Sequence, residues 1–501
     1  MKLNFLRYIA LCITTCALAQ SPEQLNNKVQ GAILDLASFV AIPNDAIHHN
    51  DILTNISWLE TQFNQRGFTT KTLETSGEPL FFAELAQRKN VPTLLFYMHF
   101  DGQSVDATKW DQENPYTMVL KKPNGNTWEN VHLTAIDPKN QKEWRLFGRS
   151  TSDDKGPIVL FLHAIDLLKE TNATLPYNIK IILDSEEEKS SKPLPEAVKR
   201  YKDVLAADFL IINDGPVHPS GKPTIIYGCR GITTLSLTTY GAIVPQHSGH
   251  YGNYAPNPAL QLAQLLASMK DAEGRVLIPE YYDGISITNE EQRILKSVPD
   301  SEANIVRKLQ INTPDKVGAY YQEALQYPSL NIRGLASGWV GKEARTIVPA
   351  TATAELDLRL VPETDGNRLK SLVKKFIGDQ GFYVIDHEPT SLERASHSKI
   401  ITVKEGNVAP AFRTPLSHPF GGFLQQILKN TFEEEVVQIR IMGGTVPIAP
   451  FINELGIPAF IVPLVNADNN QHSPNENLKI AQLYYGIQTF YSIMSTPYSN
   501  N

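Results

Sequence analysis

The side chains in this sequence that suit acid–base or metal chemistry gather where apolar segments begin or end. The clearest case is TLLFYMHFDG, residues 93–102, in which an apolar run stops at His99 and Asp101. Other groups follow the runs NIKIILD, DFLIIND and PAFIVPLV or precede an apolar helical segment, and their members are Asp153, Asp154, Asp184, Glu186, Glu187, Glu188, Asp214 and His472. Taken one at a time, such groups are more typical of turns, helix starts and solvated surfaces.

Together these groups predict a metal site. The carboxyl ends of parallel strands lie along one edge of a sheet, and ligands bind at that edge. Carboxylates crowded there would repel one another unless a cation held them. Only Cys229 of the three cysteines lies beyond the first 19 residues, so the sequence excludes a thiolate zinc site and an internal disulfide. Oxygen and imidazole ligands suit Zn²⁺, Co²⁺ or Mn²⁺.

Composition and apolar patterning predict the fold that positions these groups. A chain of 501 residues with 42% hydrophobic and 20% charged residues is long enough for more than one domain and a large core. Its net charge of −7 gives no indication of nucleic-acid binding. Predicted helices (23–41, 52–66 and 157–170) alternate with predicted buried strands (93–99, 178–184, 208–214 and 458–465). This alternation is typical of an α/β domain with a mostly parallel sheet flanked by helices.

The middle of the chain has a different pattern. The segments ITTLSLTTYG and TATAELDLRLVP alternate with a period of two, as half-exposed strands do, and PNPALQLAQLLASM and NRLKSLVKKFIG have the spacing of amphipathic helices. Buried strand character returns near the C-terminus. The sequence therefore predicts an α+β domain at 232–411, inserted between two parts of the larger domain, 20–231 and 412–501.

The first 19 residues are typical of a secretory signal peptide. Lys2 and Arg7 form the positive region, the apolar run 8–18 follows, and the small residues around Ala19 favour cleavage after it. The run is shorter than the roughly 20 residues of a membrane span. We therefore expect a secreted or periplasmic protein without a membrane span. A lipoprotein anchored through Cys16 is less favoured, because ITTC has threonine where a small residue is usual.

Seven motifs occur in the order seen in one enzyme family, the dinuclear-zinc amidohydrolases, and the chain resembles that family over nearly its whole mature length. The motifs are HFD, GRSTSDDKGP, DSEEEKSS, NDG, YGCRG, HSGHYG and HSPNEN. The family includes carnosinase-type dipeptidases, glutamate-type carboxypeptidases, aminoacylases and desuccinylases. Through KPTIIYGCRG and PQHSGHYG the chain is most similar to the carnosinase-type dipeptidases. The resemblance implies that the inserted domain is a lid and dimerisation domain.

The resemblance implies two divalent metal ions, most simply Zn²⁺, with Mn²⁺ or Co²⁺ as alternatives. It assigns ligands by position in the motifs: one ion by His99 and Asp214, the other by Glu188 and His472, with Asp153 bridging them. In this family the peptide bond after the bridging aspartate is often cis, so we expect a cis bond between Asp153 and Asp154. Three carboxylates and a bridging hydroxide balance the charge of two divalent ions.

Two further carboxylates would support the reaction. Asp101 would accept the second ring N–H of His99 and fix its tautomer. Glu187 would be the general base that takes a proton from water and returns it to the leaving amine. Glu186 offers an alternative register for the base and the ligand. We prefer Glu187 and Glu188 because EEKSS then aligns with the family's pattern.

The inserted domain would supply substrate-binding residues. In the family, the histidine matching His247 crosses from one subunit to the active site of the other and stabilises the tetrahedral oxyanion, which makes a homodimer necessary. His250 is a nearby alternative. Arg359 would grip the substrate carboxylate with its guanidinium fork. Thr346 and Gly444 match further segments that contact substrate.

These features predict an exported, dimeric, dinuclear metallohydrolase that cleaves a peptide-like bond near a free carboxylate. A dipeptidase or carboxypeptidase acting on small peptides is the first choice. A deacylase acting on N-acyl amino acids is the second, since the same metal chemistry serves both. A non-catalytic metal- or peptide-binding protein is a third possibility, and the presence of Glu187 argues against it, because a decayed site should first lose its base.

Overall fold

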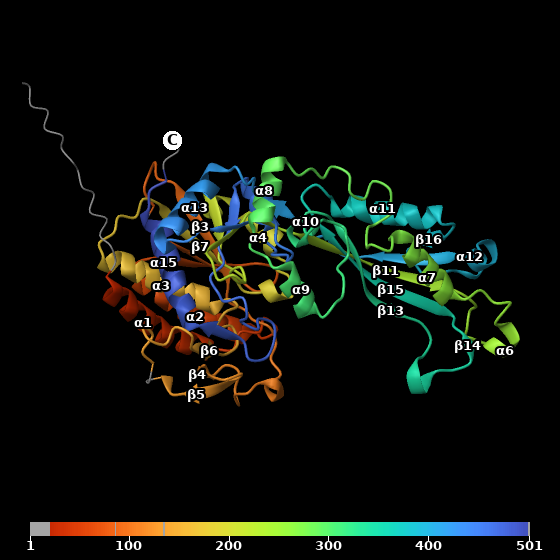
Figure 1. The fold of residues 1–501 in the computed structure, drawn as a ribbon, viewed down its shortest axis with the longest axis horizontal. Coiled ribbons are helices and arrows are strands. Elements are labelled where there is room, and N and C mark those ends of the chain that lie inside the picture. Colours follow the sequence, from red (N-terminus) through yellow and green to blue (C-terminus); the bar gives the residue numbers. More distant parts are fainter. Residues whose placement is uncertain (1–20, 86, 134–135, 499–501) are drawn as a thin grey trace, which may run out of the picture.

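The protein consists of a large α/β body and a narrower extension (Figure 1). The structure is a computed structural model that describes residues 21–85, 87–133 and 136–498. Both ends of the described chain contribute to the body, and the middle of the chain forms the extension. The predicted signal peptide at 1–19 lies outside the described residues. Within those residues, no helix is both long and apolar enough to cross a membrane.

An eight-stranded sheet forms the centre of the body. Its strand order is β1 (Thr69–Leu73), β2 (Leu80–Glu84), β7 (Asn178–Asp184), β3 (Thr93–His99), β8 (Phe209–Ile212), β20 (Ala459–Ile461), β9 (Thr224–Ile226) and β19 (Val437–Ile439). The four strands β7, β3, β8 and β20 run parallel, as do β9 and β19. Strands β1 and β2 add to the sheet in antiparallel fashion, and β20 pairs antiparallel with β9. The mostly parallel sheet predicted from the sequence is confirmed.

Helices cover both faces of this sheet. One face packs against α1 (Pro22–Val40), α2 (His49–Gln65), α3 (Lys155–Glu170), α13 (Pro419–Phe432) and α15 (Ile480–Ser495). The other packs against α4 (Leu194–Arg200), α14 (Ala449–Leu455) and the end of α5 (Lys202–Leu205). Strand β3 shows why: Phe96 and Met98 enter the first core, and the intervening Tyr97 enters the second. A strand buried on both faces is apolar throughout, which explains its continuous apolar sequence.

The first helix begins where its sequence predicts. Ser21 accepts a hydrogen bond from the backbone N–H of Gln24, whose side chain accepts one from the backbone of Ser21, and Pro22 occupies the first turn. This reciprocal cap satisfies N–H groups that a helix start otherwise leaves open.

Two small sheets lie beside the large one and are not predicted by the sequence. The first has the order β21 (Asn477–Lys479), β6 (Arg145–Phe147), β4 (Val119–Asn124) and β5 (Thr127–Val131), with antiparallel pairing throughout. The second pairs β10 (Gly228–Cys229) with β18 (Phe412–Arg413). Strand β21 begins at Asn477, the last residue of the HSPNEN motif, so this pairing attaches the motif to the chain just before Asp153.

The extension contains a five-stranded sheet with helices on one face. The order is β13 (Ser329–Ala336), β15 (Thr351–Leu360), β11 (Gly231–Tyr240), β17 (Ile400–Glu405) and β16 (Tyr383–Ile385), and only β16 and β17 are parallel. Alternate residues such as Leu237 and Leu356 are buried against α7 (Pro258–Met269) and α11 (Gly366–Asp379). This α+β architecture agrees with the sequence pattern. The domain boundaries themselves stay a prediction.

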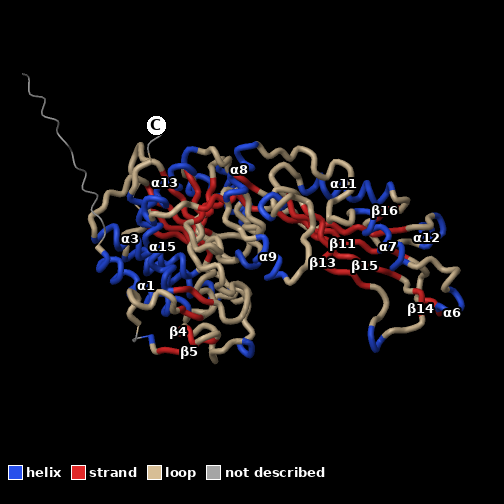
Figure 2. The backbone as a smooth tube through the Cα atoms, in the orientation of Figure 1, coloured by secondary structure: helices blue, strands red, loops and turns tan. Residues whose placement is uncertain are grey.

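The remaining elements of the extension lie at its tip and toward the body (Figure 1). The tip has the paired strands β12 (Gln246–His247) and β14 (Ile347–Val348), the helix α6 (Ser248–Tyr251) and a short turn of helix at Gly341–Glu343. Short helix α12 (Ser391–Ser396) precedes β17, and α8 (Asn289–Ser297), α9 (Glu302–Leu309) and α10 (Tyr321–Ala324) lie toward the body. Figure 2 shows that much of the chain between the two large sheets is loop.

Polar contacts connect the α8–α10 segment to the body. Arg440, which is buried, lies 2.8 Å from Glu291 of α8 and donates a hydrogen bond of 2.7 Å to Gln326. His218 Nε2, likewise buried, lies 3.1 Å from Asp300 Oδ1. Removing one partner of such a buried contact leaves the other without compensation, which destabilises the fold. The insert is therefore attached to the body at these points as well as through the chain connections.

Candidate metal centre

The predicted ligands come together beside the carboxyl ends of β3, β7 and β8. They form two groups that share Asp153: one of His99, Asp153 and Asp214, the other of Asp153, Glu188 and His472. In each group one ligand atom from every residue lies within 4.8 Å of the others. The parallel register explains the meeting, since β3 pairs with both β7 and β8 and their ends lie side by side.

Asp153 lies between the two histidines. Its Oδ1 is 3.0 Å from His99 Nε2, and its Oδ2 is 3.1 Å from His472 Nε2. His472 Nε2 is also 3.4 Å from Glu188 Oε2. The peptide bond between Asp153 and Asp154 is cis, as predicted. One carboxylate thus presents a separate oxygen to each group, which is the arrangement that a ligand shared by two ions requires.

The donors fit divalent cations. Asp153 Oδ2 is buried and makes no hydrogen bond of good geometry among the described residues. Burial raises the pKa of Glu188 to about 7 and that of Asp214 to about 6, because the charged form loses hydration. A bound cation would reverse this effect by favouring the ionised carboxylates. The set of oxygen and imidazole ligands matches Zn²⁺, Co²⁺ and Mn²⁺.

The pKa values of the two histidines are raised as well, which for an imidazole favours the charged form. The Asp153 carboxylate, 3.1 Å from Nε2 of His472, raises the pKa of His472 to about 9. Burial would lower the pKa of His99, but its contacts with Asp101 and Asp153 raise it well above its ordinary value. Imidazole must be neutral at the coordinating nitrogen to bind a metal, so binding would displace these protons.

Asp101 is buried and connects two parts of the centre. Its Oδ1 accepts a hydrogen bond of 3.0 Å from the backbone N–H of Glu187, and its Oδ2 accepts one of 3.1 Å from the backbone N–H of Glu188. Oδ1 also lies 3.3 Å from His99 Nδ1. Asp101 therefore holds the turn that carries the predicted base as well as the ring that it was predicted to orient.

The geometry favours Glu187 and Glu188 over the shifted register. Glu186 turns away and accepts a hydrogen bond of 2.8 Å from the backbone N–H of Glu78. Glu187 is half-buried as a whole residue, and the burial of its carboxyl group raises its pKa well above its ordinary value. A carboxyl group of that kind is suited to take up and return a proton.

The structure also shows contributors that the sequence did not single out. Gln103 donates a hydrogen bond of 2.7 Å to Glu188 Oε2. Glu476 accepts hydrogen bonds from the chain around Asp153. Gln103 lies two residues beyond the HFD motif and Glu476 lies within HSPNEN, yet a glutamine or a glutamate in a polar loop gives no sign of its partner.

The residues predicted to bind substrate form two separate groups. Arg359 on β15 donates a hydrogen bond of 2.9 Å to Thr445 Oγ1, so it lies beside the loop that contains Gly444. His247 and Thr346 are neighbours at the tip of the extension, where Ser248 N donates to Thr346 O at 3.0 Å. The tip lies far from the metal centre of the same chain (Figure 1).

His247 is exposed, and its immediate surroundings are local. Its Nδ1 accepts a hydrogen bond of 3.0 Å from Gly249 N, and its ring centre is 4.8 Å from that of His250. Neither histidine contacts the predicted metal ligands of its own chain.

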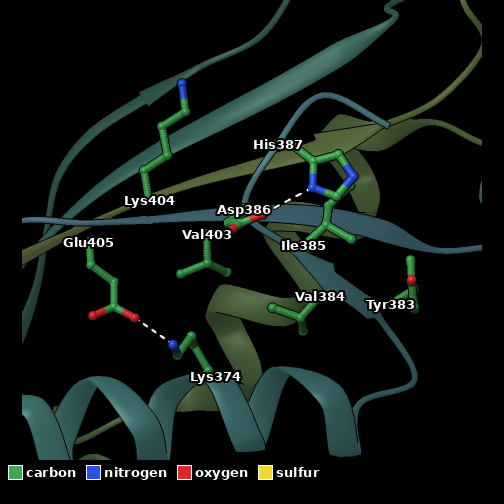
Figure 3. Close-up of a pocket in the computed structure, with 9 residues that line it drawn as sticks. All are labelled: Lys374, Tyr383, Val384, Ile385, Asp386, His387, Val403, Lys404 and Glu405. Atoms are coloured by element: carbon green, nitrogen blue, oxygen red, sulfur yellow. Dashed lines mark hydrogen bonds and ion pairs between the residues drawn. The ribbon is translucent and has the colours of Figure 1, made fainter. Parts of the chain in front are cut away.

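A cavity of about 720 Å³ lies in the extension, away from the metal centre (Figure 3). It is lined by residues of α11, β16 and β17, and none of the predicted site residues borders it. Among its charged groups, Lys374 pairs with Glu405 and His387 with Asp386. Such mutual pairing gives no indication of a ligand.

Comparison with known families identifies the centre's relatives. The model of the peptidase family M20/M25/M40 matches residues 95–496. The chain belongs to this family. It is a metal-dependent peptidase, which confirms the resemblance seen in the sequence motifs.

Curated relatives are similar over most of their length. The chain is 26% identical over 484 residues to the Cys-Gly metallodipeptidase DUG1 of Candida albicans, covering 94% of this chain and 90% of the relative. It is 27% identical over 421 residues to the Beta-Ala-His dipeptidase of Mus musculus, covering 82% and 78%.

Solved structures share the fold. An M20 family metallo-carboxypeptidase, Sso-CP2 from Sulfolobus solfataricus, is similar with a TM-score of 0.74 and 26% identity, covering 93% of this chain and 98% of that one. Human carnosine dipeptidase 1 has a TM-score of 0.71 and 22% identity, covering 94% and 97%. The two-part architecture is therefore that of M20 peptidases.

Proposed function

We propose that this protein is an exported, homodimeric, dinuclear metallodipeptidase. The observation that carries the proposal is the position of Asp153, whose two oxygens face two separate ligand groups, with Glu187 on the adjoining turn. The names of the similar curated proteins, a Cys-Gly metallodipeptidase and a Beta-Ala-His dipeptidase, support a dipeptide substrate. Export rests on the signal-like residues 1–19.

Each candidate ligand would bind the ion of its own group. His99 and Asp214 would hold one ion, Glu188 and His472 the other, and Asp153 both. Bound divalent ions of this kind acidify water and polarise a scissile carbonyl. Zn²⁺ is the first candidate, with Mn²⁺ and Co²⁺ as alternatives.

Glu187 would move the proton. Its backbone N–H is fixed by Asp101, so the carboxyl group starts from a defined place. Burial favours the protonated form of Glu187, and two nearby cations would favour the ionised form. These opposing influences suit a group that accepts a proton from water and then gives it to the leaving amine.

Arg359 would bind the carboxylate of the substrate. Its guanidinium already donates to Thr445 Oγ1 in the loop of Gly444, which leaves other N–H groups to form a paired contact with a carboxylate. A dipeptide with a free C-terminus fits this arrangement. An N-acyl amino acid also has such a carboxylate, and for that reason the deacylase reaction must be tested beside it.

A second subunit would complete the site. His247 and Thr346 lie at a tip that cannot reach the metal centre of the same chain, and a partner subunit could present them there. The same part of the extension exposes large apolar residues, namely Ile243, Val244, Tyr254, Leu335, Trp339 and Val340. Exposed apolar patches are typical of surfaces that bind another protein.

The test is free-amine release by zinc-reconstituted protein. A panel of dipeptides is compared with N-acetyl and N-succinyl amino acids, each with and without a chelator. We expect chelator-sensitive cleavage of the dipeptides. Cleavage of the acylated amino acids alone would move the protein to the deacylases and leave the metal assignments in place.

The base is tested with Glu187→Gln. Turnover should be abolished while both metal ions remain bound, because the amide cannot accept the proton and coordinates nothing in either group. The matched control is Glu186→Gln, which should retain activity. Loss of metal from the Glu187 variant would favour the shifted register instead.

A further inference from the structure

Glu476 makes an unusual set of contacts for a loop carboxylate. It is fully buried, and it lies between the HSPN segment and the first residue of β21. Its two oxygens accept five hydrogen bonds. Oε2 accepts from Arg149 Nη1 at 2.7 Å and Ser150 N at 3.0 Å, and Oε1 accepts from Ser152 N at 2.9 Å, Ser152 Oγ at 2.9 Å and Asp153 N at 3.0 Å.

These contacts use the full accepting capacity of a carboxylate. An ionised carboxylate has about four lone-pair sites, and this one receives three backbone N–H groups, a hydroxyl and a guanidinium. The three N–H groups belong to Ser150, Ser152 and Asp153, so the backbone of the turn curves around the anion. Hydrogen bonds to a charged partner are roughly twice as strong as those between neutral groups.

The same residue joins two segments that are distant in sequence. Asp153 and Glu476 are 323 positions apart, and His472 precedes Glu476 by a single short turn. Asp153 Oδ2 and His472 Nε2 face each other at 3.1 Å. Both segments that meet at Glu476 thus present a candidate ligand to the same ion.

We infer that Glu476 is a positioning residue that holds the 149–153 turn against the 472–476 loop, so that Asp153 and His472 face one metal ion. The inference rests on the proposed function, because it needs these two residues to be ligands. It adds a group that would not touch the metal itself. It also predicts an asymmetry: the ion bound by Asp153, Glu188 and His472 depends on Glu476 through two ligands, and the other ion through Asp153 alone.

Glu476→Gln is the direct test. Glutamine has one accepting oxygen, and its NH₂ group would confront either the Arg149 side or the Ser152 and Asp153 side with a second donor. Zn²⁺ is titrated into metal-free protein by calorimetry, and Co²⁺ is added in parallel so that its visible spectrum reports ligand geometry. We expect the site of Asp153, Glu188 and His472 to lose affinity by about tenfold to a hundredfold, as changes to the partners of metal ligands typically do.

Two further variants make the result decisive. Ser152→Ala removes only the hydroxyl bond to Oε1, and it should give a smaller loss in the same direction if Glu476→Gln does not fold. Glu291→Gln is the matched control, because it also removes a carboxylate from an arginine, Arg440, but lies away from the metal centre. Its zinc affinity should equal that of the wild type.

The outcomes separate the inference from the proposed function. Wild-type zinc affinity and an unchanged Co²⁺ spectrum in folded Glu476→Gln, or in Ser152→Ala where the first does not fold, would overturn the inference alone. Equal loss of affinity in Glu291→Gln would also overturn it, since the loss of any ion pair would then be enough to weaken metal binding. Wild-type protein that binds neither Zn²⁺ nor Co²⁺ would overturn both.

Discussion

Replacing Asp101 by asparagine should weaken zinc binding by about tenfold to a hundredfold without unfolding the metal-free protein. The carboxylate accepts the backbone N–H groups of Glu187 and Glu188 on separate oxygens, and it lies 3.3 Å from His99 Nδ1. Asparagine keeps one acceptor oxygen. Its NH₂ group must therefore face at least one of these donors, so at least one hydrogen bond to a charged group is lost.

The size of the effect follows from that loss. A hydrogen bond to a charged group contributes about 1.5–3 kcal/mol. If this free energy comes from metal binding, each 1.4 kcal/mol is a factor of about ten in affinity. The stability of the metal-free protein should change less, because burial raises the pKa of Asp101 and so disfavours its charge before any metal is bound.

The assay is zinc titration with a competing chelator, together with thermal unfolding in excess chelator. The control is Asp35→Asn, because Asp35 also pairs with a histidine, His163, at 2.9 Å but lies on α1 away from the centre. Asp35→Asn should bind zinc as the wild type does. The reasoning fails if Asp101→Asn keeps wild-type zinc affinity, or if it unfolds while Asp35→Asn does not.

Three further predictions concern substrate binding, packing and pH. Arg359→Lys should raise KM for dipeptides about tenfold or more with a smaller change in kcat, because lysine cannot form the paired contact; Arg333→Lys on exposed β13 is the control. Gly486→Ala should lower the free energy of unfolding by about 1–3 kcal/mol, because the added methyl would overlap Leu160 of α3. Gly378→Ala adds a methyl that meets open space, so it should raise the free energy of unfolding by up to about 1 kcal/mol. Urea unfolding measures both changes. Burial raises the pKa of Asp300, but hydrogen bonds from His218 and Gln322 lower it below its ordinary 3.8. The stability lost in Asp300→Asn should therefore be full at neutral pH and should disappear as the pH falls below 3.8, and a difference that persists in acid would contradict this account.

The sequence predicted those elements whose burial is continuous or regular. Strands β3 and β7 were predicted at their full bounds, and α1 and α3 were predicted within two residues, because long apolar runs and clear caps leave little choice. Strands β9, β19 and β21 were not predicted. Each has three residues, which is too short for a period to show, and their pairing depends on distant segments.

The candidate site divides in the same way. Candidate ligands such as His99 and Asp214 stand at the ends of predicted strands, so the parallel sheet implied that they would meet. Glu476 and Gln103 lie in loops, and their partners become visible only when the chain is folded. The trans role of His247 remains a proposal, because one chain shows only that the residue is far from its own metal centre.

The position of β20 has a consequence for biosynthesis. This strand lies between β8 and β9, although it is made more than 200 residues after them. A ribosome must therefore release almost the entire chain before the centre of the sheet can close, and contacts of such long range fold slowly. Until then the edge of β8 is open to pairing with other chains. The candidate ligand His472 follows β20, so a nascent chain has only part of the proposed ligand set, and loading of the proposed metal site must come after synthesis is nearly complete.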